Sequence, residues 1–255
     1  MEESDDSKSI FIIETVRRAI SDGHAVILVS ESDPRQTIEM LERKGFDAIQ
    51  YINRGVLTVL DNGSTYAVAS TQLDANKLIY RWIGLISDIK EKSGCQGIIV
   101  IGTPRLFIDT NNIDKLMMYE RQIGRKFNIP LEAVCCYDAV GFSKLGFTNM
   151  IRFLNYHEYT IYQGGVFFQW QPSMILRIID RAIDDVLGPG TSRLLLKTLK
   201  LVYNADRDSI VSKPELFEAM LRGVFGKTAT IVLDNIQREI TKELMYLRNA
   251  PKGED

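Results

Sequence analysis

The fold of this chain is decided by the stretch Leu131-Glu132-Ala133-Val134-Cys135-Cys136-Tyr137-Asp138, an apolar run that ends in a phenol and an acid. Short apolar runs with polar ends are typical of strands that lie in a covered sheet. Helical patterns flank this run, beginning at Asn112 on one side and passing through Phe147, Ile151 and Leu154 on the other. Strands that alternate with helices predict an α/β domain with a mostly parallel sheet.

The same alternation extends toward the N-terminus. Apolar runs at Ala25–Val29 and Gly97–Gly102 predict two more strands buried on both faces, and Val56–Leu60 predicts a third. We expect Thr65–Ala69 to be extended. The remaining strand-like segments, expected to close the sheet at one edge, are Tyr159–Tyr162 and Val166–Phe168. Helices are predicted between the strands by apolar stripes such as Leu78, Trp82, Ile86 and Ile89.

The composition of the chain changes at Gln171-Pro172, beyond which we find only helical patterns. Apolar residues recur at helical spacing in four segments, and this spacing predicts that Val202 and Val224 face inward. Ser212 and Glu215 have the spacing of a capping box. We therefore predict an α/β domain over residues 1–170 and a small all-α bundle over residues 171–255. A core of that size benefits from docking or dimerising.

Composition excludes several classes of protein. The 255 residues carry a formal net charge of -2, so no bulk attraction to nucleic acid is expected. This net charge does not exclude a local basic face. No apolar run reaches the ~20 residues of a membrane span, and the acidic start is unlike a secretory signal. The 3 cysteines form no C-x-x-C pair and there are only 2 histidines, so we expect neither disulfide nor metal site. A cytoplasmic protein is predicted.

The motifs of nucleotide chemistry are missing from the sequence. Neither G-x-x-x-x-G-K-[ST] nor G-x-G-x-x-G occurs, and the loop after Val29 offers the acids Glu31 and Asp33 where glycines and a lysine would bind phosphate. The strand Ile98–Ile101 continues into Gly102-Thr103-Pro104, without an acid to hold magnesium. We therefore expect no ATP hydrolysis, no cofactor and no enzymatic activity.

Glu120 is the acid whose position is most unusual, because helical spacing places it in the apolar stripe of Ile113, Leu116 and Ile123. A buried carboxylate needs a partner or a raised pKa. Arg105, just past a strand, is a candidate partner. Two interpretations stay open: a structural ion pair or an acid at the margin of the stripe, and an acid that anchors a ligand.

Other polar residues have two interpretations as well. Cys135 and Cys136 are neighbours on a strand, so their side chains point to opposite faces and cannot readily bridge each other. They act either as small apolar residues or as redox sensors. Tyr137 and Asp138 end a strand, where α/β sheets bind ligands, but Asp138 would serve equally well as a helix cap. His157 is either a base, with Glu158 beside it, or a structural residue.

The order of these motifs resembles a known family. From about Ile10 to Phe168 the chain resembles the MEDS domain, the methanogen/methylotroph sensory domain of a dichloromethane-responsive repressor, itself similar to the RecA/KaiC ATPase fold with a degraded catalytic loop. Members usually begin with a strand that carries a His and a Tyr, whereas this chain begins at the following helix. The segments that carry the resemblance are His24–Glu31, Tyr119-Glu120, Ala133–Asp138 and Phe153–His157.

Residues Ile175 to Leu247 resemble the Nitrososphaera output domain, a helical module of archaeal proteins, through segments such as Asp208-Ser209-Ile210 and Val224-Phe225-Gly226. Together the two resemblances imply a non-catalytic sensory protein of archaeal signal transduction, acting as a homodimer. Its expected ligand is a small molecule or a protein. A DNA-binding regulator and a scaffold for a KaiC-like ATPase are the alternatives. The expected ligand-binding residues are Glu31, Arg105, Glu120, Tyr137, Asp138 and His157.

Overall fold

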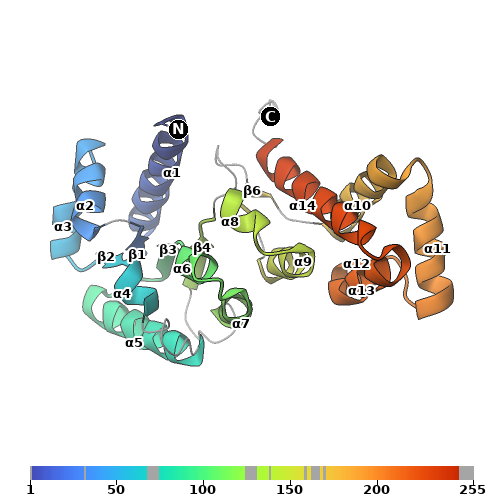
Figure 1. Cartoon of the computed structure of the whole chain (residues 1–255). Helices are drawn as coiled ribbons and strands as arrows, with labels where there is room; N and C mark the ends of the chain where they lie inside the picture. The colour runs from blue at the N-terminus through green and yellow to red at the C-terminus, as the bar shows by residue number, and fades with distance from the viewer. Residues whose placement is uncertain are drawn as a thin grey trace. The chain divides into compact units, whose positions relative to one another are not determined.

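The computed structural model describes residues 2–31, 33–67, 75–123, 131–137, 139–157, 160–161, 167–168 and 171–246 (Figure 1). The chain forms two compact units, Met1–Asp138 and Ala139–Asp255. None of the helices in the described part of the chain has the length and apolar character that crossing a membrane requires.

The first unit contains a four-stranded parallel sheet in the order β2-β1-β3-β4. Leu28 of β1 lies opposite Val59 of β2 on one side and Ile101 of β3 on the other. All residues of β1 and β3 are buried, which explains why their sequences are apolar without alternation. The prediction of an α/β domain with a mostly parallel sheet is thus confirmed. The strands are β1 (Ala25–Ser30), β2 (Leu57–Asp61), β3 (Ile98–Gly102) and β4 (Leu131–Cys135).

Helices cover both faces of this sheet (Figure 1). One face packs against α1 (Glu2–Ser21), α2 (Pro34–Arg43) and α3 (Ala48–Asn53), and the other against α5 (Ala75–Ser93) and α7 (Ile113–Ile123). The core on the α1 side includes Val16, Leu28, Leu41 and Ile101. Helix α2 begins at Pro34, because the Asp33 carboxylate caps it by accepting from the Arg35 amide at 2.8 Å.

Two short helices follow strands of the sheet, α4 (Asn62–Ala67) after β2 and α6 (Arg105–Asp109) after β3. The expectation that residues 65–69 are extended is wrong for residues 65–67, which belong to helix α4. Residues 68 and 69 lie outside the described residues. The physical reason is a cap, since the Asp61 carboxylate accepts from the Ser64 amide at 2.6 Å and starts a helical turn.

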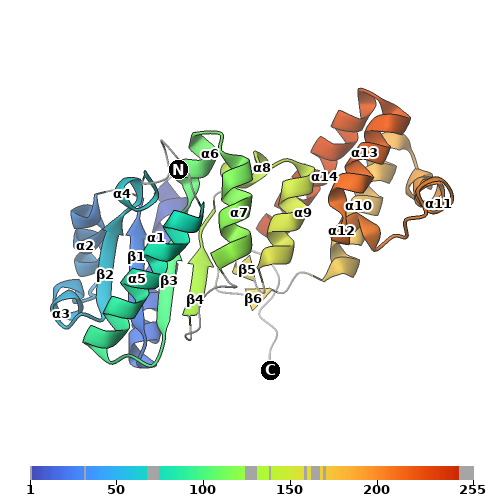
Figure 2. The same cartoon turned by 90° about the horizontal axis from the view of Figure 1, so that it is seen from below.

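The second unit is built mainly of helices (Figure 2). Its central pair is α10 and α14, joined by a buried hydrogen bond in which Asn235 Nδ2 donates to the Ala182 carbonyl at 2.9 Å. The expected strand pair is present as β5 (Thr160–Ile161) and β6 (Phe167–Phe168), but it forms a separate antiparallel sheet and does not extend the larger one. The helices are α8 (Ala139–Ser143), α9 (Phe147–Tyr156), α10 (Pro172–Leu187), α11 (Thr191–Tyr203), α12 (Ser209–Ser212), α13 (Pro214–Phe225) and α14 (Thr228–Tyr246).

The compact units divide after residue 138, whereas the sequence predicted a boundary at residue 170. The reason is that α9 contacts the helical bundle. Thr148 Oγ1 donates to Glu218 Oε2 at 2.6 Å, and Asn155 Nδ2 donates to the Val211 carbonyl at 2.9 Å. The Phe147 and Phe217 rings also pack, with centroids 5.5 Å apart. A helix predicted as the last helix of the α/β domain thereby contributes to the core of the second unit.

Three local predictions in the helical unit are wrong. Val202 and Val224, predicted to face inward, are exposed. Ser212 does not cap α13, because its hydroxyl donates to the Asp208 carbonyl and Lys213 occupies the cap position. Helical spacing identifies the apolar positions of a helix but cannot say which of them another helix will cover.

The sheet core makes a stability prediction. Ile101 is 1% exposed on a central strand, so Ile101→Ala leaves a cavity and should reduce the free energy of unfolding by about 2–5 kcal/mol. Urea denaturation followed by far-ultraviolet circular dichroism measures the change. The matched control is Ile49→Ala, at a position that is 57% exposed, and it should change the free energy by less than ~0.5 kcal/mol. Equal effects of the two substitutions would contradict the assignment of Ile101 to the core.

Candidate functional site

A buried carboxylate lies where strand β4 ends. Cys135 pairs with Gly102 of β3, and the Cys136 amide donates to the Gly102 carbonyl at 2.8 Å. Side chains alternate along an extended segment, so Cys135 and Tyr137 point to one face of the sheet and Cys136 to the other. Cys136 packs against the core on the α1 side. The prediction that the two cysteines face opposite ways is confirmed.

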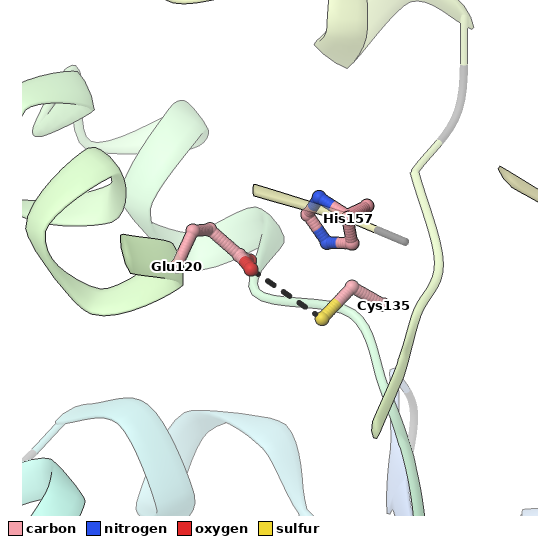
Figure 3. Close-up of side chains that lie close together, drawn as sticks. All are labelled: Glu120, Cys135 and His157. Atoms are coloured by element: carbon pink, nitrogen blue, oxygen red, sulfur yellow. Dashed lines mark hydrogen bonds between the residues drawn. The ribbon is translucent and has the colours of Figure 1, made fainter. Parts of the chain in front are cut away.

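Cys135 and Tyr137 both donate hydrogen bonds to Glu120 of α7. The Cys135 thiol donates to Glu120 Oε2 at 3.6 Å (Figure 3), and the Tyr137 hydroxyl donates to Glu120 Oε1. Glu120 is only 3% exposed, so the burial inferred from its place in the helical stripe is confirmed. Two donors on separate oxygens offset the cost of removing this carboxylate from water.

An aromatic layer packs beside the carboxylate. The Phe107 and Tyr119 rings stack with centroids 5.8 Å apart, and the Tyr66 ring meets both edge-on, with centroids 6.0 Å and 6.1 Å away. Gly102 makes room for this layer, because a Cβ there would lie 3.0 Å from the Tyr66 hydroxyl oxygen.

Burial sets the protonation of this cluster, defined here as Tyr66, Tyr119, Glu120, Cys135 and Tyr137. Desolvation is the main cause that raises the pKa of Cys135 and of Tyr137, and the nearby Glu120 carboxylate raises both further. Desolvation also raises the pKa of Tyr66 and of Tyr119. The thiol and the phenols therefore stay protonated at neutral pH and serve as hydrogen-bond donors. As a thiol, Cys135 is a poor nucleophile.

The remaining residues expected at the site are Glu31, Arg105, Asp138 and His157. Glu31 follows β1 and is exposed. Arg105 is the first residue of α6, but its side chain lies outside the described part of the structure, as does all of Asp138. His157 belongs to the second unit, where its ring stacks on Phe153 with centroids 4.2 Å apart and its Nδ1 donates to the Phe153 carbonyl at 2.9 Å.

Sequence reasoning missed Tyr66 and Phe107. Tyr66 was placed in an extended segment, and Phe107 lies on the unpredicted helix α6. Both are almost completely buried, yet neither belongs to an apolar run or stripe long enough to predict its partners. Gly102 at the end of an apolar strand was the only available signal, since a glycine there permits close approach of another group.

Glu120 and Cys135 also have donor atoms suited to a metal. In the first unit, however, the Cys135 proton is directed at the Glu120 carboxylate, and metal binding would require the thiolate. In this cluster the Cys135 thiol and the Tyr137 hydroxyl each keep a proton and donate it to a different oxygen of Glu120.

Comparison with known proteins assigns the family. A family model described as the methanogen/methylotroph, DcmR sensory domain (MEDS) matches residues 3–157, and the chain belongs to this family. Membership indicates a sensory or regulatory role. No curated protein and no solved structure matches the chain. The matched range includes the whole Glu120 cluster and ends at His157.

The hydrogen bond from Tyr137 can be tested by removing one oxygen atom. Tyr137→Phe should lower the free energy of unfolding by about 1–3 kcal/mol, because the buried Glu120 oxygen loses a donor. Denaturant unfolding measures this loss. Tyr203→Phe, at an exposed phenol on α11, is the control and should have little effect. A Tyr137→Phe protein as stable as the wild type would show that the hydrogen bond does not stabilise the unit.

The thiol environment predicts slow alkylation. At pH 8.5 iodoacetamide should modify Cys135 at least about tenfold more slowly than Cys95, since the raised pKa of Cys135 leaves little thiolate and both residues are half-buried. Glu120→Gln removes the negative charge that contributes to this shift, so it should speed the reaction at Cys135 several-fold and leave Cys95 unchanged. Peptide mass spectrometry measures both rates. Equal rates at the two thiols in the wild type would refute the assignment.

Proposed function

We propose that this protein is a non-catalytic sensory protein whose first unit binds a small molecule or a protein segment at the carboxyl edge of its sheet. The observation that carries this proposal is the buried Glu120 cluster at the end of β4 in a chain of the MEDS family. A sensory role needs a stable recognition surface, and the cluster supplies a fixed, dehydrated support for one.

The arrangement of the sheet supports this position for the ligand. All four strands are parallel, so their carboxyl ends meet at one edge. Strand β1 has β2 on one side and β3 on the other, and the connecting helices leave to opposite faces, which is where open α/β sheets bind ligands. Ser30, Asp61, Gly102 and Cys135 end the four strands.

Polar groups follow the strands at this edge of the sheet. Asn62 Nδ2 donates to the Thr103 carbonyl at 2.8 Å and thereby links the residues that follow β2 and β3. Asn62 Oδ1 is buried without a hydrogen-bond partner among the described residues, which makes it a suitable acceptor for a ligand donor. Glu31 follows β1 and adds an exposed carboxylate. This combination of acceptors favours a ligand with N–H or O–H donors.

Two features of the first unit support the proposal that it catalyses no reaction. The sequence contains no phosphate-binding loop, and the first turn of α2 is occupied by the Asp33 carboxylate and by Pro34, which has no amide hydrogen. The Cys135 thiol and the Tyr137 phenol stay protonated, so neither is an activated nucleophile. We propose that the chain derives from a RecA/KaiC-like ATPase fold and has kept recognition without hydrolysis.

We further propose that the helical unit, from residue 139 onward, is the output module of an archaeal signalling protein. Its sequence resemblance to the Nitrososphaera output domain supports this assignment. Residues with both signs of charge on its surface, including the pair Arg181–Glu243 at 3.4 Å, fit a protein partner better than DNA.

Thermal denaturation in the presence of small metabolites tests the site. At least one compound should raise the melting temperature of the whole chain, and Glu31→Gln should reduce that shift by more than half. Glu39→Gln, at an exposed acid on α2, is the matched control and should leave the shift unchanged. Binding that depends on neither Glu31 nor Asn62 would contradict the proposed edge. Release of phosphate from Mg-ATP that Glu31→Gln abolishes would show that the protein is an enzyme.

A further inference from the structure

Helix α11 exposes an apolar stripe on the second unit. Leu194, Leu201 and Val202 are 65%, 84% and 67% exposed. The helix has a different set of residues for its own packing, because Leu195 and Leu199 are buried on the side that faces α10. The exposed leucines are therefore not needed to attach α11 to its unit. Contiguous exposed apolar residues of this kind commonly mark an interaction site.

A groove of about 120 Å³ lies beside this stripe. Its second wall is the end of α13, where Val224 is 51% exposed. The groove is thus a small, mostly apolar depression between two helices, and it can accept apolar side chains from the face of a third helix. Its lining consists of Thr191, Leu194, Leu195, Thr198, Val224 and Phe225.

A basic ridge runs along the outer side of α11. Arg193, Lys197 and Lys200 recur at helical spacing and are all exposed. Helix α11 contains no Asp or Glu, so the ridge carries three positive charges without a compensating acid on the same helix. A second copy that placed α11 against α11 would bring two such ridges together, and like charges oppose that arrangement.

We propose that α11 and the end of α13 form a docking groove for an amphipathic helix of a partner protein, with Asp and Glu beside its apolar stripe. The apolar stripe of the partner would cover Leu194, Leu201 and Val224, and its acids would meet the basic ridge. Charge complementarity of this kind guides association and sets register. Nucleic acid would use the cations but leave the leucines without a partner. The docking groove is inferred independently of the proposed sensory function. Only the role of the partner rests on that proposal, since the docked helix would receive the signal.

Fluorescence anisotropy with a designed peptide tests the groove. The probe is a labelled helical peptide with leucines at helical spacing and glutamates on both flanks, titrated with the full chain. The comparison peptide has every glutamate replaced by lysine. The acidic peptide should bind at least about tenfold more tightly, and added salt should weaken it, because exposed charge pairs are screened.

Surface substitutions assign the binding to α11. Leu201→Glu should weaken the acidic peptide at least about tenfold. The double substitution Lys197→Glu/Lys200→Glu should shift the preference toward the lysine peptide. The matched control is Val140→Glu, at a position on α8 of the same unit that is 68% exposed, and it should change neither affinity. Circular dichroism verifies that each variant is folded.

Several results would overturn the proposal. Equal affinity for the two peptides, or binding that Leu201→Glu leaves unchanged, excludes an acidic helix in this groove. A dimer in light scattering that Leu201→Glu dissociates assigns the groove to a second copy, and binding to anionic vesicles without peptide binding assigns it to a membrane surface. The peptide titration contains no sensory ligand, so a negative result does not bear on the proposed ligand site at the sheet edge. In the same way, a negative result in the thermal denaturation test does not bear on the docking groove.

Discussion

A carboxylate removed from water must find hydrogen-bond donors, and Glu120 finds two of them at the end of strand β4. Because extended residues two apart point to the same face, Cys135 and Tyr137 both reach the acid on α7. The contact fixes the end of the strand relative to the helix. The aromatic rings of Tyr66 and Phe107 contribute to the buried surroundings in which these hydrogen bonds form. The hydrogen bonds to Glu120, surrounded by aromatic rings, thus hold the carboxyl end of β4 against α7.

This construction supports the proposal that the first unit recognises a ligand without catalysing a reaction. An activated nucleophile needs a lowered pKa or an adjacent base, whereas burial raises the pKa of Cys135 and of Tyr137. The first turn of a helix is a common anion-binding position, and in α2 it is occupied by Asp33 and Pro34. The Glu31 carboxylate and Asn62 Oδ1 are hydrogen-bond acceptors, as expected for the proposed ligand that donates hydrogen bonds. A sensory role for a MEDS family member is consistent with each of these features.

In the helical unit, periodicity predicted which positions are apolar but not which of them are buried. Spacing in α11 identifies Leu195, Leu199 and Val202 as apolar positions of one helix, and the structure buries only the first two. Val224 on α13 is likewise exposed. Both valines were expected in a core, but both are exposed, and Val224 lines a surface groove. An apolar residue that its own unit does not cover is available to a partner, which is why these differences from the prediction lead to the docking proposal.

The sequence by itself determined the central strands β1 and β3 of the parallel sheet, because apolar runs without alternation are typical of strands covered on both faces. It also indicated the burial of Glu120, since helical spacing places this acid in an apolar stripe. Only the tertiary structure decided that Tyr137 and Cys135 are its partners, that Tyr66 joins the same cluster, and that α9 belongs with the helical unit. These contacts join elements far apart in the chain, and they depend on strand register and helix packing, which no local pattern of residues encodes.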